Sequence, residues 1–281
     1  MVIRLKPPAI DYDGFIDTVV AERQAGRNAA YFDGIHASWK TRIQEYLDGR
    51  GNPEIVKPWP VVTNENKQKF QNLYSKPREG NVQKPILESL RSRTLQVCPA
   101  CGEDGTPNTL DHYLPQESYP DFSITPANLS PMCDICQGEK KAKTVNAANE
   151  RLFLHPYFDE FTDQQVMELA LGRPLAAPST ITLRPHQSLD AAQSALVLRH
   201  LEELGIGRRY YHFVRDQYLH LLRLTSLMRQ QGQDVREQLT NFCAMASFKS
   251  VNSWLHVFYA GVLADAELVA YLENGDLPDF L

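Results

Sequence analysis

Two cysteine pairs mark the segment of this chain where chemistry is most readily expected. Cys98 and Cys101 form the first pair and Cys133 and Cys136 the second, each with two intervening residues. At this spacing both thiolates of a tight turn reach one tetrahedral zinc ion. Four thiolates fill the coordination shell and leave no position for a substrate, so we expect a structural Zn²⁺. Thirty-one residues separate the pairs, which requires a structured insert between them.

The insert holds an acid beside a histidine. Asp111 and His112 stand in the sequence LDHYLP, whose apolar flanks predict a short strand ended by proline. A neutral histidine can take a proton from water near pH 7, and a carboxylate can bind a hard divalent cation. Asn128 follows in the insert, and Gln137 and Lys140 come after the last cysteine, where a helix is expected to begin. These residue types suit metal-assisted hydrolysis of a phosphodiester.

In this segment the sequence resembles the HNH endonuclease family, also called ββα-metal or His-Me finger nucleases, in its cysteine-bearing form. The resemblance covers residues 98–143. It consists of the paired cysteines, the Leu-Asp-His strand with its proline, an Asn-Leu step and a Cys-x-x-Cys-x-x-x-Lys helix, all in the family's order. It implies a ββα-metal core that cleaves phosphodiester bonds with Mg²⁺ or Mn²⁺. DNA is the expected substrate, with RNA left open.

The resemblance also implies roles for single residues. His112 would be the general base that activates water, Asp111 a ligand of the catalytic cation, and Asn128 the residue that holds the histidine-bearing loop in place. The lysines that follow the last cysteine are expected to bind the substrate: Lys140, Lys141 and Lys143.

Gln137 stands where family members commonly carry asparagine or histidine as the second ligand of the catalytic cation. Glutamine has the same amide oxygen on one more methylene, so we expect it to reach the cation directly or through water. The alternative is that glutamine at this position alters the metal preference or weakens catalysis. Asp134 and Glu139 are the replacement ligands if Gln137 does not serve.

The overall charge argues against extensive phosphate binding, since the chain carries a formal net charge of −5 at pH 7. The segment 64–100 differs, because its seven cations outnumber its three anions. A locally positive surface is therefore expected beside the cysteine segment.

The N-terminus carries prolines and aspartates where a secretory signal needs an apolar core, and the apolar runs are shorter than a membrane span. We therefore expect a cytoplasmic protein with no membrane contact. In that compartment cysteines favour metal binding or free thiols over disulfides. Cys243, alone in an apolar stretch, is expected to act as a small buried hydrophobe.

The expected fold is mainly α with a small α+β zinc module, a ββα-metal core flanked by helical regions. Hydrophobic periodicity predicts four helices before the module: Phe15–Ala21, Ala29–Tyr46, Lys67–Tyr74 and Ile86–Leu95. The predicted regions are an N-terminal helical region at 1–95, the nuclease module at 96–160, a linker at 161–187 and a C-terminal helical region at 188–281.

Two apolar stripes with helical spacing occupy the C-terminal region. One consists of Tyr211, Val214, Tyr218, Leu221, Thr225 and Met228; the other consists of Leu255, Phe258, Val262, Ala266, Val269 and Leu272. The face opposite the first stripe is cationic and carries Arg208, His212, Arg215 and Arg223. A solvated face, a phosphate contact and a docking surface all remain open there.

The function predicted from the sequence is a metal-dependent HNH endonuclease. By fold-level analogy the layout is similar to HNH effector subunits of bacterial anti-phage systems such as the Septu type, so an ATPase or a second copy of the chain is an expected partner. Gln137 and the acidic net charge favour one alternative, a zinc module that binds nucleic acid or protein without cutting it. A second alternative is an adaptor whose C-terminal helices dock a partner. The Asp111–His112 pair favours the enzyme.

Overall fold

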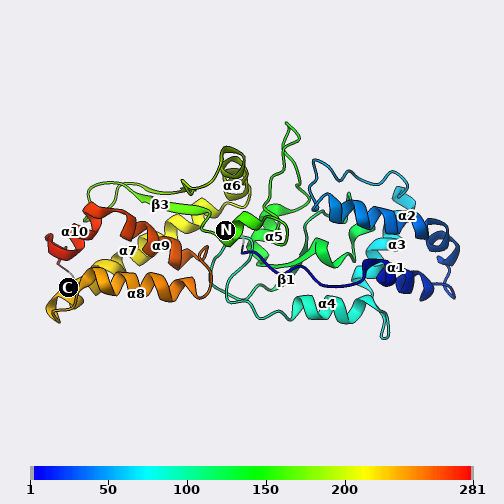
Figure 1. The fold of residues 1–281 in the computed structure, drawn as a ribbon, viewed down its shortest axis with the longest axis horizontal. Coiled ribbons are helices and arrows are strands. Elements are labelled where there is room, and N and C mark those ends of the chain that lie inside the picture. Colours follow the sequence, from blue (N-terminus) through cyan, green and yellow to red (C-terminus); the bar gives the residue numbers. More distant parts are fainter. Residues whose placement is uncertain (1–2, 280–281) are drawn as a thin grey trace. The chain divides into compact units, whose positions relative to one another are not determined.

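The computed structural model describes residues 3–279 of the 281-residue chain. The chain is mostly helical with two small antiparallel hairpins, which confirms the predicted fold class (Figure 1). The α-helices are α1 (Tyr12–Ala21), α2 (Ala29–Asp48), α3 (Asn64–Ser75), α4 (Gln83–Arg91), α5 (Asp134–Lys140), α6 (Ala191–Glu203), α7 (Ile206–Gln230), α8 (Val235–Ser247), α9 (Trp254–Ala264) and α10 (Ala266–Asn274). The strands are β1 (Thr109–His112), β2 (Leu129–Met132), β3 (Met167–Leu171) and β4 (Ile181–Pro185), and the 3₁₀ helices are η1 (Pro120–Phe122), η2 (Pro126–Asn128) and η3 (Glu160–Asp163).

The chain forms two compact units. The N-terminal unit consists of Arg4–Leu95 and Thr106–Asp159, and the C-terminal unit of Gln96–Gly105 and the chain from Glu160 onward, with Ile3. The first cysteine turn thus belongs to the C-terminal unit, whereas the sequence grouped it with the rest of residues 96–160. The reason is that backbone oxygens of this turn accept hydrogen bonds from side chains of the C-terminal helices.

An aromatic core organises the N-terminal unit. On α2, Phe32, Trp39 and Tyr46 follow at seven-residue intervals and are all fully buried, as one face of a helix requires. Phe70 of α3 packs edge-on against Trp39, with 5.1 Å between the ring centroids. The indole N–H of Trp39 donates to the backbone oxygen of Asp121, 2.9 Å away. The helical region therefore fixes the insert that carries the candidate site.

The insert forms the predicted strand and a partner for it. β1 pairs antiparallel with β2, with His112 opposite Leu129. Apolar side chains of α4 and the hairpin form one buried cluster: Leu87, Leu90, Leu110 and Leu129. α5 follows β2 directly and contacts β1, which gives the order β1, β2, α5.

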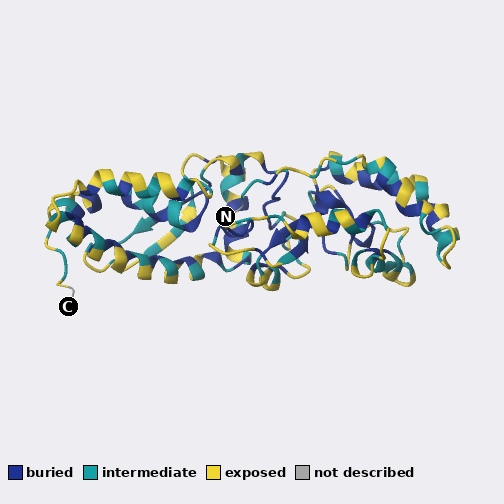
Figure 2. Ribbon diagram, turned by 90° about the horizontal axis from the view of Figure 1, so that it is seen from below, coloured by how far each residue is buried: buried dark blue, intermediate teal, exposed yellow. Residues whose placement is uncertain are grey.

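In the C-terminal unit, α7 presents alternating buried and exposed residues, as does α8 (Figure 2). Most of the first predicted stripe is buried, but Tyr211 is 41% exposed and Tyr210 takes the core position instead. α9 packs on β3 at Gly261, where a Cβ atom would lie 2.7 Å from the Cβ atom of Leu169. Only glycine allows this close approach.

The predicted linker contains a hairpin. β3 and β4 pair antiparallel, and Arg184 donates to Glu168 across the strands at 2.7 Å. Met167 and Leu169 point to the buried side, while Glu168 between them is partly exposed. The segment 173–185 is rich in Pro, Ala, Ser and Thr, which is typical of a linker, and most of these residues lie in the loop between the strands.

The second predicted stripe is divided between two helices. The side chain of Asp265 accepts a hydrogen bond from the backbone N–H of Leu268 at 3.0 Å and caps α10. α9 and α10 therefore meet at a bend of 85°. Within residues 3–279, no single helix combines the length and the apolar composition of a membrane span, and only this bent pair does so jointly.

Candidate functional site

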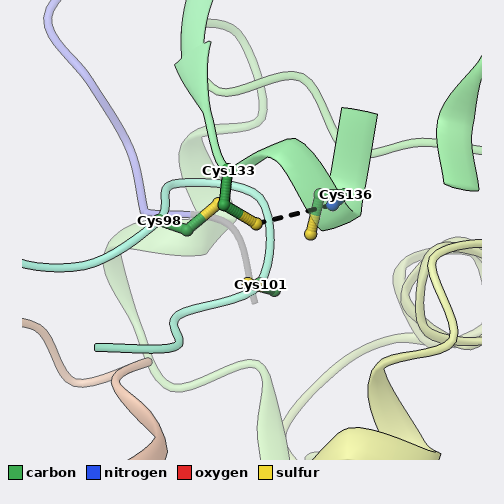
Figure 3. Close-up of side chains that lie close together, drawn as sticks. All are labelled: Cys98, Cys101, Cys133 and Cys136. Carbon is green, nitrogen blue, oxygen red and sulfur yellow. Dashed lines mark hydrogen bonds between the residues drawn. The ribbon is translucent and has the colours of Figure 1, made fainter. Parts of the chain in front are cut away.

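The four paired cysteines form one cluster. The Sγ atoms of Cys98, Cys101, Cys133 and Cys136 all lie within 4.8 Å of one another (Figure 3). Tetrahedral zinc with Zn–S bonds of about 2.3 Å needs sulfur atoms about 3.8 Å apart, so the grouping fits this ion. Four sulfur donors without an oxygen donor suit structural Zn²⁺. The predicted grouping is confirmed. Among residues 3–279, these four cysteines are the group of His, Cys, Asp or Glu side chains whose ligand atoms lie close enough together to hold one metal ion.

Three side chains of the C-terminal unit hold the first cysteine turn. His200 of α6 donates from Nε2 to the backbone oxygen of Ala100 at 2.7 Å, and the indole of Trp254 donates to the backbone oxygen of Cys101 at 2.7 Å. Arg209 of α7 places a guanidinium nitrogen 3.8 Å from the Cys101 sulfur. A cation beside a thiolate offsets the negative charge of four cysteines around one Zn²⁺. No sequence motif marks these three residues.

The second cysteine turn begins α5. Cys133 is the N-cap, and its sulfur accepts a hydrogen bond from the backbone N–H of Cys136 at 3.4 Å (Figure 3). The helix predicted after the last cysteine therefore starts at Asp134. This arrangement couples the metal cluster to the helix that carries Gln137 and Lys140.

His112, at the end of β1, is buried with 8% of its surface exposed. Its Nε2 lies 2.9 Å from the backbone oxygen of Ser123, and the Tyr74 ring packs edge-on against it. Because a carbonyl oxygen only accepts, Nε2 carries the proton and Nδ1 has the free lone pair. Burial lowers the pKa of His112, so the imidazole is neutral near pH 7.

Asn128 closes the loop that follows His112. Its side-chain oxygen accepts from the backbone N–H of Leu114 at 2.8 Å, and its side-chain nitrogen donates to the backbone oxygens of Leu114 at 3.0 Å and Phe122 at 3.3 Å. The hydroxyl of Tyr46 donates to the same side-chain oxygen at 3.2 Å. One buried amide therefore ties together three parts of the chain around His112.

Asp111 and Lys140 form a buried ion pair. The Lys140 ammonium lies 3.0 Å from the Asp111 carboxylate and donates to the backbone oxygen of His112 at 2.7 Å. Because α5 packs on β1, Lys140 is only 1% exposed. The structure thus places Lys140 with Asp111 instead of on a substrate-facing surface. Lys141 is exposed, and Lys143 is partly exposed.

Gln137 lies in α5, three residues before Lys140, and is partly exposed. Residues three apart are neighbours on a helix surface, so Gln137 lies closer to the Lys140 side of α5 than Asp134 or Glu139 does. Asp134 and Glu139, the replacement ligands, are both exposed. Gln137 is therefore the better placed of the three to serve beside Asp111.

His155, in the His-Pro segment that follows the cysteine insert, is a buried residue that contacts Tyr46 and Tyr157. Its Nδ1 accepts from the backbone N–H of Tyr157 at 3.1 Å, and its Nε2 lies 3.0 Å from the Tyr46 hydroxyl. The ring is fully buried, and burial lowers the pKa of His155 well below its usual value of 6.5. Tyr46 thereby links His155 to Asn128.

The lowered pKa of His155 predicts a loss of stability in mild acid. The unfolded chain binds a proton near pH 6.5, whereas the folded chain resists it. The stabilisation is complete above pH 6.5 and is lost as the pH falls toward the lower pKa of the folded state. We expect the free energy of unfolding in urea to fall more steeply below pH 6.5 for the parent than for His155→Gln. The exposed His220→Gln is the control. Equal slopes for all three proteins would contradict the assignment.

No protein-family model matches the chain, and no solved structure matches it. The chain is 30% identical over 158 residues to protein ea31 of Escherichia phage lambda. The aligned part covers 53% of this chain and 52% of ea31, so the chain spans about half the length of the curated relative it matches. The similarity is distant and leaves the family unassigned.

Proposed function

We propose that this chain is a metal-dependent endonuclease that hydrolyses phosphodiester bonds. DNA is the favoured substrate over RNA. The observation that carries the proposal is the state of His112, a neutral imidazole whose Nε2–H is bound to Ser123 and whose Nδ1 has a free lone pair. A general base needs this protonation state and a fixed orientation. Asn128 and Tyr74 supply the orientation.

In the proposed reaction, Nδ1 of His112 takes a proton from water as the water oxygen bonds to phosphorus. The bond from phosphorus to the leaving sugar oxygen breaks, and that oxygen gains a proton from solvent. The imidazolium formed is stabilised by the Ser123 carbonyl and by the negative charge of Asp111, both of which favour the protonated ring.

Asp111 and Gln137 are the proposed ligands of a catalytic Mg²⁺ or Mn²⁺, which would neutralise charge on the phosphate when bound. The donor set is one carboxylate and one amide oxygen, both of the hard type that these ions prefer. Mg²⁺ commonly takes few protein ligands and leaves its other positions to water and phosphate. Lys140 would hold the carboxylate of Asp111 in position.

Substrate binding is proposed for the exposed cations near the site. Lys141 follows α5 directly and is exposed. The helices α3 and α4 come from the segment with the local excess of positive charge. An effector role in anti-phage defence belongs to this proposal and rests on the resemblance alone.

The test is cleavage of plasmid DNA by the purified chain with Mg²⁺ or Mn²⁺, with EDTA as the control. If Gln137 is a ligand, Gln137→Asn is expected to keep or raise the cleavage rate, because it restores the residue common in the family. Gln137→Ala is expected to lower the rate more than it lowers the melting temperature. If both variants behave like the parent, Gln137 is not the ligand.

A non-catalytic zinc module that binds nucleic acid or protein is the second candidate. The pairing of Asp111 with Lys140 favours it, because a buried ammonium already balances the carboxylate. This candidate predicts a stable complex with DNA, seen as a gel shift, and no cleavage with either metal. The same purified protein, tested both for a gel shift and for cleavage, distinguishes the two functions.

A further inference from the structure

The proposed base is held by a short 3₁₀ turn that lies further along the chain. The helix η1 ends at Phe122, and the next residue, Ser123, places its backbone oxygen 2.9 Å from Nε2 of His112. A carbonyl oxygen accepts and does not donate, so this contact keeps the ring proton on Nε2 and the lone pair on Nδ1. The state of His112 therefore depends on the position of η1.

The turn has little support of its own. It spans three residues, and the backbone N–H of Ser123 donates to the Pro120 oxygen at 3.0 Å within it. Short 3₁₀ helices have poor hydrogen-bond geometry, so contacts with other elements must fix this one. Asn128 supplies one contact, to the Phe122 backbone oxygen at 3.3 Å, and α2 supplies further ones.

Two neighbouring side chains of α2 hold η1. Nε of Arg42 donates to the carboxylate of Asp121 at 2.9 Å, and the indole of Trp39 donates to the backbone oxygen of the same residue at 2.9 Å. The Arg42 guanidinium also lies over the Phe122 ring, with its carbon 4.9 Å from the ring centroid. Arg42 and Trp39 are three residues apart, which makes them neighbours on the helix surface.

The ion pair of Arg42 and Asp121 is buried. Asp121 is fully buried and Arg42 is 7% exposed. Burial raises the pKa of Asp121 to about 6 and Arg42 opposes the rise, so the carboxylate is ionised near pH 7. A buried ion pair contributes little net stability compared with apolar side chains of similar volume. The position that the pair imposes on η1 explains it better than stability does.

The guanidinium of Arg42 is itself fixed. One terminal nitrogen donates to the carboxylate of Glu45 at 2.8 Å, and the other donates to the backbone oxygen of Lys57. A planar fork that is bound in three directions has a defined orientation, which a lysine ammonium at this position would lack.

We propose that Arg42 is a positioning residue, which holds η1 through Asp121 and Phe122 so that Ser123 fixes the imidazole of His112. Its catalytic effect rests on the proposed nuclease function, whereas its effect on the His112 ring does not. Arg42 lies outside the segment 98–143 that carries the family resemblance. The inference therefore adds a residue of the helical region to the site.

The main variant is R42M/D121L in the full chain. It replaces both charges by apolar side chains, because Arg42→Met alone would leave a buried carboxylate unpaired. We expect kcat for plasmid cleavage to fall about ten- to a hundredfold, the scale of a small misplacement of a catalytic group, with KM nearly unchanged. Arg42→Lys keeps a cation beside Asp121 but loses the fork, so it should lower kcat less.

The second measurement is the NMR spectrum of protein labelled with ¹⁵N in the histidine rings. The His112 signals are identified by their absence in His112→Gln. In the parent we expect one protonated and one bare ring nitrogen, as the contact with Ser123 requires. In R42M/D121L we expect both nitrogens to shift toward the averaged values of an exposed ring such as His220, and Arg42→Lys should show a smaller shift.

The control for stability is Val19→Ala. Val19 is fully buried in α1, which packs on α2, so its replacement should lower the melting temperature. The cleavage constants and the His112 signals should stay those of the parent. If Val19→Ala lowers kcat as much as R42M/D121L does, lost stability explains the effect and the proposal is wrong.

Two further results would overturn the proposal. One is a folded R42M/D121L variant whose His112 signals match the parent, whatever its kcat. The other is a change in KM alone, which would assign Arg42 to substrate binding. Should R42M/D121L not fold, the same readings are taken from Arg42→Lys. If the parent does not cleave DNA, the proposed function fails, while the His112 signals still show whether Arg42 holds the ring.

Discussion

Replacing His112 with glutamine is expected to lower plasmid cleavage by about 10²–10⁴-fold, the usual cost of losing a positioned general base. Glutamine is chosen because its side-chain amide can still donate to the backbone oxygen of Ser123, the partner of His112 Nε2. Alanine would leave that buried oxygen unpaired and open a cavity beside Tyr74. The glutamine variant therefore separates loss of the base from loss of the fold.

The matched control for this prediction is His155→Gln. His155 is also a buried neutral histidine of the N-terminal unit, but it contacts Tyr46 and Tyr157 and has no assigned part in the reaction. It should cost stability and leave cleavage by the folded protein close to that of the parent. If the two variants lose cleavage equally, structural damage explains the effect. If His112→Gln cuts like the parent, His112 is not the base.

The cysteines and the apolar periodicity were the parts of the fold that the sequence predicted best. The Cys-x-x-Cys spacing is a local constraint imposed by one ion, so it identified the cluster without knowledge of the fold. Four helices of the N-terminal region were also predicted, with boundaries that shifted by a few residues. Helix ends depend on caps and contacts that periodicity does not encode.

The contacts that complete the site were not predictable from local patterns. Trp39 and Tyr46 contact the insert although they precede it by about 80 positions in the chain. Trp254 contacts the first cysteine turn although it follows that turn by 153 positions. Lys140 was predicted to lie on the surface because lysine side chains are usually exposed. Its burial depends on how α5 packs on β1, which brings the ammonium to Asp111.

The β3–β4 hairpin was missed for a different reason. The loop between its strands, residues 172–180, has the composition of a linker, rich in Pro, Ala and small polar residues, and each strand has only five residues. Periodicity over so short a segment carries little information. The break at Asp265 was missed because the apolar stripe continues across it. The side chain of Asp265 caps α10 with a hydrogen bond, so the chain forms two helices here instead of one.

Replacing Cys98 with serine is expected to remove the bound zinc and to lower the melting temperature sharply. The hydroxyl is a poor zinc ligand near neutral pH, so three thiolates would remain around the ion. In structural sites the metal-binding energy, about 10–16 kcal/mol in small zinc modules, is available for folding. The measurements are the zinc content per chain, expected to be about one in the parent, and thermal unfolding with and without a strong chelator.

The matched control is Cys243→Ser, which removes a thiol that lies outside the four-cysteine cluster. Cys243 contacts His256, with 3.6 Å between the sulfur and Nδ1, and is only partly buried. Its replacement should leave the zinc content unchanged and shift melting slightly. Because His200 and Trp254 hold the first turn through backbone oxygens, zinc loss in Cys98→Ser should leave these hydrogen bonds in place. Parent protein that contains no zinc, or a Cys98→Ser variant that keeps both its zinc and its melting temperature, would show that the cysteines do not form a structural metal site.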